Sequence, residues 1–259
     1  MKLKFLLLSV ASLFATISVS AQTADEIIDN YFENTGGADN WRALTGFISK
    51  ATVNQQGMDI PITMIALKDG RQIMQFELQG KEVVQQAFDG NEAWGTNFMS
   101  MEAEKRDNET TENIKREAGD FPDPFLDYAD NGYSVELLGE ETIEGTACFK
   151  IKLTKKPKLV DGAEVDNISY YFFDTENFVP IAVESEIKTG QMKGKISTIG
   201  FSDYQEVEGL YFPFSISQGI KDMGSQVINF TSIEVNPAVD DAIFKFPVST
   251  ETTTDEGNN

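Results

Sequence analysis

The sequence contains no histidine and a single cysteine, Cys148. Histidine is the residue that most often moves protons near neutral pH, and it is a frequent ligand of zinc. A lone cysteine cannot form an internal disulfide, and a chain without histidine offers its thiol no imidazole base. We therefore expect a binding protein and not an enzyme, without metal or cofactor. Cys148 is expected to be a small, partly buried strand residue.

Basic residues are also scarce. The chain has 21 lysines and arginines against 42 aspartates and glutamates, which gives a net charge of −21. A surface this negative repels nucleic acids and anionic lipid head groups. The composition predicts a highly soluble protein with neutral or cationic partners, and it argues against a nucleic-acid partner.

Long apolar runs are confined to the start of the chain. Lys2 and Lys4 flank the apolar run Phe5–Phe14, and the small residues Val19–Ala21 follow it. This pattern is typical of a secretory signal peptide, residues 1–21. The run is shorter than the roughly 20 residues of a membrane-spanning helix, and no cysteine stands at the cleavage site to accept a lipid. We expect a soluble secreted protein without a lipid anchor, whose net charge becomes −23 when the two lysines leave with the signal.

The remaining sequence predicts a mainly β fold. Residues 24–34 show the apolar spacing of one helix face, preceded by a capping box. From Phe47 onward, apolar and polar residues alternate with a period of two, and turn dipeptides such as Asp69–Gly70 separate the segments. The alternation pauses at a charged insertion, residues 102–130, and resumes between residues 133 and 235.

The domain organisation is expected to be simple. No linker is long enough to divide the chain, and there is no solenoid-length repeat or glycine-rich phosphate loop. We expect one domain of α+β type, dominated by antiparallel strands, over residues 22–248. Residues 249–259 are rich in threonine, glutamate and asparagine and are predicted to be a disordered tail.

Four short segments stand in a characteristic order. They are Phe88–Trp94, Tyr171–Ile181, Asp203–Phe214 and Ile233–Phe244. Each contains turn or strand-start residues that have a plain structural role. Together they resemble the signatures of the LolA/LolB-like family, in particular the secreted chains of Bacteroidetes type labelled outer membrane lipoprotein-sorting proteins. The resemblance extends from the first helix to Phe246.

The resemblance implies a strongly curved antiparallel sheet that forms a half-open β-barrel covered by a few helices. In that family, the concave face and the helices enclose an apolar cavity for the acyl chains of a lipoprotein. It implies a periplasmic chaperone, monomeric, that takes lipoproteins or lipids from an inner-membrane donor complex towards an outer-membrane acceptor. Arg42 and Arg71 are candidates for a lid-closing arginine. The sequence is longer than the best-known carriers, with the insertion at residues 102–130 and a loop at residues 157–166.

Alternation and helix periodicity select the apolar residues that could line such a cavity. They are Ile27, Ile28, Tyr31 and Phe32 on the first helix, and Met64, Met74, Phe76, Leu78, Trp94, Phe98, Phe149 and Ile151 on strands. Each of them could equally fill a solid core. Acyl chains gain ~0.8 kcal/mol per buried CH₂, so a cavity of this kind binds tightly without polar chemistry.

Two charged clusters have alternative interpretations. Asp120, Asp123, Asp127 and Asp130 could offer oxygen ligands to calcium, but their spacing matches no EF-hand, and a solvated acidic loop is the preferred interpretation. A second cluster, Lys152, Lys155, Lys156 and Lys158, could dock an acidic partner or could simply be a solvated strand end.

Three other functions stay open from the sequence. The same fold could serve as an envelope lipid-sensing or protein-interaction module without catalytic activity. The barrel could be packed solid and act only as an interaction surface. A hydrolase would need two converging carboxylates, and no local motif selects such a pair.

Overall fold

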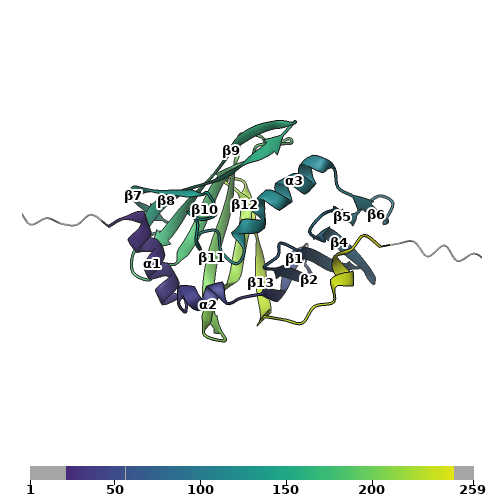
Figure 1. Cartoon of the computed structure of the whole chain (residues 1–259), viewed down its shortest axis with the longest axis horizontal. Helices are drawn as coiled ribbons and strands as arrows, with labels where there is room; N and C mark the ends of the chain where they lie inside the picture. The colour runs from purple at the N-terminus through teal and green to yellow at the C-terminus, as the bar shows by residue number, and fades with distance from the viewer. Residues whose placement is uncertain (1–21, 56, 248–259) are drawn as a thin grey trace, which may run out of the picture.

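One antiparallel sheet of 13 strands forms most of the molecule (Figure 1). The computed structural model describes residues 22–55 and 57–247, so the predicted signal peptide and C-terminal tail lie outside the described residues. Strands β1–β6 pair in sequence order, and so do strands β7–β13. The pairing of β1 with β13 joins these two groups into one sheet. The outermost strands, β6 and β7, do not pair, and the predicted open, mainly β fold is confirmed.

The strand bounds are as follows. The first group is β1 (Gly46–Gln55), β2 (Met58–Leu67), β3 (Gln72–Leu78), β4 (Lys81–Phe88), β5 (Ala93–Thr96) and β6 (Ala103–Lys105). The second group is β7 (Ser134–Ile143), β8 (Thr146–Val160), β9 (Ala163–Asp174), β10 (Pro180–Glu186), β11 (Ile196–Val207), β12 (Leu210–Ile220) and β13 (Gly224–Val235).

The predicted N-terminal helix is α1 (Ala24–Asn34). Its capping box is present, because the Thr23 hydroxyl accepts from the backbone N–H of Glu26, whose carboxylate accepts from the backbone N–H of Thr23. A short helix, α2 (Ala38–Arg42), follows. None of the helices within the described residues combines the length and apolar character needed to cross a bilayer.

The link between α1 and α2 requires glycine at position 36. Gly36 has a φ of +113°, and a Cβ atom there would lie 2.1 Å from the backbone oxygen of Gly209. A backbone hydrogen bond holds Gly36 close to Gly209, because the N–H of Tyr211 donates to the carbonyl of Thr35 over 3.0 Å. The helical layer is thus tied to the turn between β11 and β12.

The charged insertion is partly helical, as expected from its charged and helix-prone residues 102–118. It comprises β6, the helix α3 (Asn108–Glu117) and a 3₁₀ turn, η1 (Ala118–Asp120). The predicted loop over residues 157–166 is wrong, because β8 and β9 continue into one long hairpin there. Exposed Pro157 lies at a register shift between Lys155 and Lys158, where a proline is tolerated within a strand pair.

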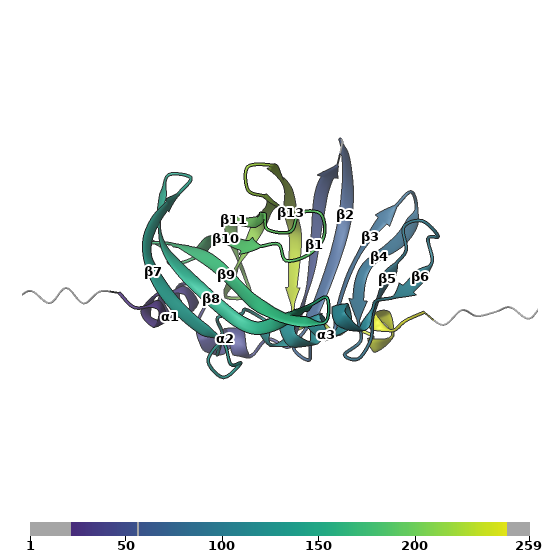
Figure 2. The same ribbon diagram turned by 90° about the horizontal axis from the view of Figure 1, so that it is seen from above.

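Register assigns each side chain to one of two sheet faces. The ring of Tyr31 on α1 lies 5.7 Å from that of Phe173, which is paired with Phe149 on the neighbouring strand. The face that carries these residues is named the interior face, and the opposite one is named the exterior face. Figure 2 shows β8 and β9 sweeping round to α3, which lies between them and β4–β6 and contacts both β8 and β5.

The main core lies between α1, α2, the segment before β7 and the interior face. Its buried members are Ile27, Ile28, Tyr31, Phe32, Trp41, Leu44, Phe125, Leu126, Tyr133, Phe149, Ile151, Leu153, Phe173, Leu210, Phe212 and Val235. A smaller interior cluster joins Ile114 of α3 to Phe88 and Ala93. On the exterior face, Phe244 of the 3₁₀ turn η2 (Asp241–Phe244) covers β2–β5.

Candidate functional site

A row of apolar side chains extends across the interior face beyond the helices. Paired neighbours Ser49, Met64 and Met74 share this face, as do Ala51, Ile62 and Phe76 on the same three strands. We use the name apolar wall for the half-buried apolar residues of these rows and of their continuation across β13 and β12. They are Ile60, Ile62, Met64, Met74, Phe76 and Leu78 on β2 and β3, and Ile216, Ile228 and Phe230 on β12 and β13.

The apolar wall differs from the cores beside it. Its nine members belong to none of the three buried clusters and all remain half-buried. Apolar side chains that face the hollow of a sheet, yet are not covered by helices, present hydrocarbon to whatever occupies that space. Four of them are β-branched isoleucines and two are methionines with flexible, polarizable side chains, so the wall can adapt to different apolar shapes.

The structure divides the twelve predicted cavity residues. Met64, Met74, Phe76 and Leu78 lie on the apolar wall, whereas Ile27, Ile28, Tyr31, Phe32, Phe149 and Ile151 are fully packed in the main core. Phe98 is 57% exposed beyond the end of β5, and its ring stacks on Phe76 with centroids 6.4 Å apart. The wall residues on β12 and β13 were missed, although their period-2 spacing is visible in the sequence.

Trp94 lies on the exterior face, so its placement with the interior residues is wrong. It is paired with Ala87, which is in turn paired with Ile73, and Ile73 points away from its neighbour Met74. The indole N–H donates to the carbonyl of Phe244 over 2.8 Å. Trp94 therefore anchors the C-terminal segment to the outside of the sheet.

A cavity of about 470 Å³ lies beneath α3. It is bounded by α3, by β8, β9 and β10, and by Gln86 of β4. Its side chains are mostly polar, and three serines and an asparagine of β9–β11 lie within or beside it. Gln86 is paired with Met74, so the cavity adjoins the apolar wall.

Polar contacts hold α3 over this cavity. The side-chain amide of Asn113 donates to the carbonyl of Leu159 and accepts from its N–H, at 2.8 and 2.7 Å. The carboxylate of Glu109 accepts from two backbone N–H groups in the turn between β8 and β9. Arg116 donates to the carbonyl of Pro157. Only Ile114 anchors α3 through a buried apolar side chain.

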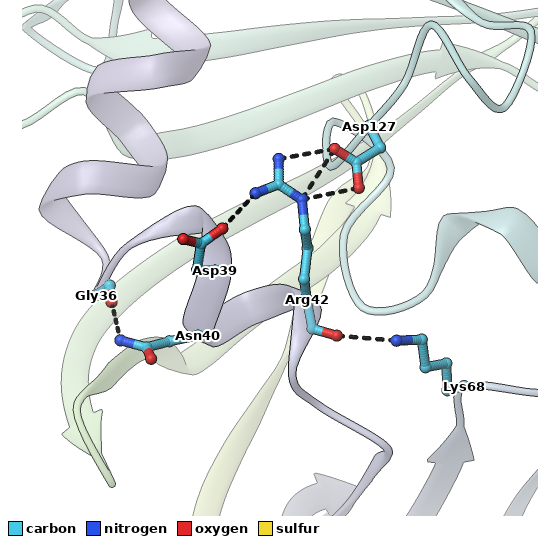
Figure 3. Close-up of polar contacts among 6 residues, drawn as sticks. All are labelled: Gly36, Asp39, Asn40, Arg42, Lys68 and Asp127. Carbon is cyan, nitrogen blue, oxygen red and sulfur yellow. Dashed lines mark hydrogen bonds and ion pairs between the residues drawn. The ribbon is translucent and has the colours of Figure 1, made fainter.

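Arg42 joins α2 to the segment before β7 and does not reach the apolar wall. Figure 3 shows its guanidinium between Asp39 and Asp127, both at 2.8 Å. The Arg42 hydrogen bond holds the pKa of the Asp127 carboxyl below its usual range. Arg71 pairs with Asp69 and Asp241 on the exterior side, over the ring of Phe244. Arg42 therefore joins two segments outside the sheet, and Arg71 fixes η2 to the turn between β2 and β3.

The acidic segment at residues 120–130 is not the solvated loop that the sequence predicts. Asp120 forms an ion pair with Lys155 and accepts from the hydroxyl of Tyr133. Asp123 accepts from the hydroxyl of Tyr31 over 2.9 Å. Two of the four aspartates thus turn inward as structural acceptors. Within the described residues, no group of three or more metal-ligating side chains is placed to hold a metal ion.

The predicted basic patch on β8 is also dispersed. Lys155 faces the interior and pairs with Asp120, while Lys152 pairs with Glu136. Lys158 pairs with Glu117 on α3. Because successive strand residues point to opposite faces, these lysines form no single surface for an acidic partner.

Asp123 gives the protein a specific dependence on pH. Burial raises the pKa of its carboxyl to about 6, above the ordinary value of 3.8, so the folded state binds this proton more tightly than the unfolded state. The stability from this group is present below pH 3.8 and is lost as the pH rises through 6. Both oxygens of Asp123 accept hydrogen bonds, one from the Tyr31 hydroxyl and one from the backbone N–H of Phe125. We expect Asp123→Asn, which like the protonated carboxyl keeps one acceptor oxygen, to be more stable than wild type by about 1–3 kcal/mol at pH 8 and equal to it near pH 4.

Urea unfolding at several pH values measures this difference. Asp130→Asn, at an exposed position of the same segment, is the matched control and should leave the pH profile unchanged. A difference between Asp123→Asn and wild type that is constant from pH 4 to pH 8 would contradict the assignment.

Comparison with known proteins supports the fold. A LolA superfamily protein from Nitrosomonas europaea superposes with a TM-score of 0.52 at 14% identity, over 87% of this chain and 98% of that one. A putative outer membrane lipoprotein-sorting protein domain from Vibrio parahaemolyticus gives 0.52 at 13% identity, over 85% and 94%. The sheet and its helices therefore have the LolA-like fold.

The sequence comparisons are less informative. A family model described as "-like: Uncharacterized protein" matches residues 126–246. No curated protein matches the sequence.

Proposed function

We propose that this protein is a carrier that binds the acyl chains of lipids or lipoproteins and moves them through the periplasm towards the outer membrane. The observation that supports the proposal is the apolar wall, which presents nine half-buried apolar side chains on the interior face. Each buried CH₂ of a chain lying there contributes ~0.8 kcal/mol. Two chains of ordinary length would therefore supply ample affinity.

The solved structures with the same fold support the proposal, because one of them is titled a putative outer membrane lipoprotein-sorting protein domain. The carrier would be one domain over residues 22–248, released after removal of the signal peptide. It would act as a monomer between an inner-membrane donor complex and an outer-membrane acceptor. The role would be non-catalytic, since the apolar wall itself carries no nucleophile or titratable side chain.

Release of cargo would involve α3. This helix is attached mainly by polar contacts at its two ends and by one buried side chain, Ile114. A segment held in this way opens at lower free energy than the core beneath α1. Movement of α3 would open the lateral boundary of the interior space between β5 and the β8–β9 hairpin.

Two measurements test the carrier function. Native mass spectrometry of protein purified from its own periplasm should show a mass excess that disappears after solvent extraction and matches a lipid or lipopeptide. The extracted protein, at equimolar ratio, should keep a synthetic diacylated peptide from aggregating and should pass it to acceptor vesicles. A bare polypeptide mass together with failure to protect the peptide would refute the proposal.

A lipid-sensing module on the same fold would give a different result. It would show the mass excess, because it too binds lipid, but it would not transfer the diacylated peptide to vesicles. The transfer step therefore separates the carrier from the sensor.

A further inference from the structure

The interior face changes character where β9, β10 and β11 meet the cavity beneath α3. Ser169 is paired with Ser185, and Ser185 is paired with Ser197, so three hydroxyls form a row across three adjacent strands. Asn167 lies two residues from Ser169 on the same face. All four side chains are half-buried. Such a serine row supplies both donors and acceptors at fixed strand spacing.

The hydrogen-bonding groups of this row are not used within the protein. In the part of the chain that the structure describes, no side-chain hydrogen bond joins Asn167, Ser169 or Ser185 to another residue. The side-chain amide of Asn113, in contrast, is hydrogen-bonded to the backbone of Leu159. The serine row and Asn167 are therefore available to a bound molecule, at the cost only of displacing water.

The lysines around the cavity are all paired with acidic residues. Lys155, Lys158 and Lys188 line it, and each forms an ion pair with Asp120, Glu117 or Glu186 respectively. Asp166 adds a negative charge to the lining. An anionic group entering the cavity would meet no unpaired cation among the described lining residues, and would be repelled by the surplus of acid. The lining therefore disfavours an anionic ligand group, and the row of hydroxyl groups, which offers hydrogen bonds without a charge, favours an uncharged polar one.

The cavity also has the position and size of a head-group site. Gln86 projects into it from β4, and its paired neighbour Met74 belongs to the apolar wall. On the other side, Ser197 is paired with Ile220 of β12. The volume of about 470 Å³ lies within the roughly 300–1,000 Å³ typical of small-molecule sites. Chains on the apolar wall would thus end where the polar lining begins.

We propose that the cavity beneath α3 binds an uncharged, hydroxyl-rich head group of the amphiphile whose acyl chains lie on the apolar wall. The inference rests on the proposed function and specifies its ligand. The serine row and Asn167 make the hydrogen bonds to the head group, and Gln86 meets it from the opposite side. The paired lysines and the additional carboxylate of Asp166 disfavour phosphate-bearing head groups of the same chain length.

Three amphiphiles with the same C12 chain test this assignment below their critical micelle concentrations. They are dodecyl maltoside, dodecyl phosphate and dodecyltrimethylammonium, and their affinities are measured by calorimetry on the full mature chain. Dodecyl maltoside should bind at least tenfold more tightly than either charged amphiphile. The double variant S169A/S185A should lose about tenfold in affinity for dodecyl maltoside and should retain its affinity for dodecyl phosphate.

Ser232→Ala, at an exposed position on the exterior face of β13, is the matched control and should change none of the three affinities. Equal affinity for all three amphiphiles, or an unchanged S169A/S185A variant, would overturn the head-group site and leave the acyl-chain carrier standing. Absence of binding by all three would overturn the proposed function as well. Circular dichroism confirms that each variant is folded.

Discussion

Replacing Phe76 by aspartate is expected to weaken the binding of acyl chains by at least about 100-fold. Phe76 lies on the β3 side of the apolar wall, with Ile62 and Val83 as its paired neighbours on β2 and β4. An ionised carboxylate at this position would have to lose water when a chain covers it, which costs several kcal/mol. About 2.7 kcal/mol corresponds to 100-fold in the dissociation constant. Titration with a fluorescent analogue of an uncharged monoacylglycerol measures the effect.

The matched control is Gln75→Asp, because residue 75 is next to Phe76 on β3 and faces the exterior. It introduces the same charge into the same strand and should change the dissociation constant by less than threefold. Should Phe76→Asp fold poorly, Phe76→Ala removes the ring without adding a charge, and about tenfold weaker binding is expected. Equal losses for the variants at positions 75 and 76 would show that the interior face is not the binding surface.

Replacing Gly36 by alanine is expected to have the largest effect on stability. Its φ of +113° is rarely adopted by residues with a side chain, and the added Cβ would lie 2.1 Å from the oxygen of Gly209. The oxygen belongs to the backbone, so no side chain can rotate away. We expect the free energy of unfolding to fall by about 3–5 kcal/mol, measured by urea denaturation.

Gly37→Ala separates backbone strain from the steric clash. Gly37 also has a positive φ, +92°, but the nearest atom to its Cβ position is the side-chain nitrogen of Asn40 at 3.9 Å. This variant should lose only about 1–2 kcal/mol. If both alanine variants lose the same free energy, the contact between the α1–α2 link and the β11–β12 turn does not control stability.

The sequence predicts those parts of the fold that depend on local chemistry. The capping box and the four apolar residues of one face define α1 with the same bounds that the structure shows. Period-2 alternation and the Asp-Gly turns define the meander from β1 to β4. In each of these elements, the residues that determine the conformation are within a few positions of one another.

The candidate site depends on information that alternation does not contain. Alternation separates Met74 from Ile73, but it does not state which of them faces the interior, because both faces of β2–β5 are covered by apolar residues in places. The exterior burial of Trp94 arises from Phe244, 150 residues further along the chain. A tryptophan on a strand is therefore no guide to the interior face.

Local sequence patterns also do not predict the serine row. Ser169, Ser185 and Ser197 are ordinary strand residues in the sequence, and only the pairing of β9 with β10 and of β10 with β11 aligns them. A β-bulge in any of these strands would have moved one hydroxyl to the exterior face. The polar part of the site is thus a property of register.

The pairing of β1 with β13 has a consequence for the order in which the molecule is completed. Phe47 on the first strand is paired with Val235 on the last one. This seam between the two groups of strands can therefore form only when almost the whole chain is present. The apolar wall crosses the same seam, with Val53 beside Ile228 and Ala51 beside Phe230. Before this seam forms, the two halves of the wall lie on two separate groups of hairpins. A carrier of the proposed kind would therefore acquire its capacity to hold cargo only when its sheet is completed, and an unfinished copy would not trap lipid prematurely.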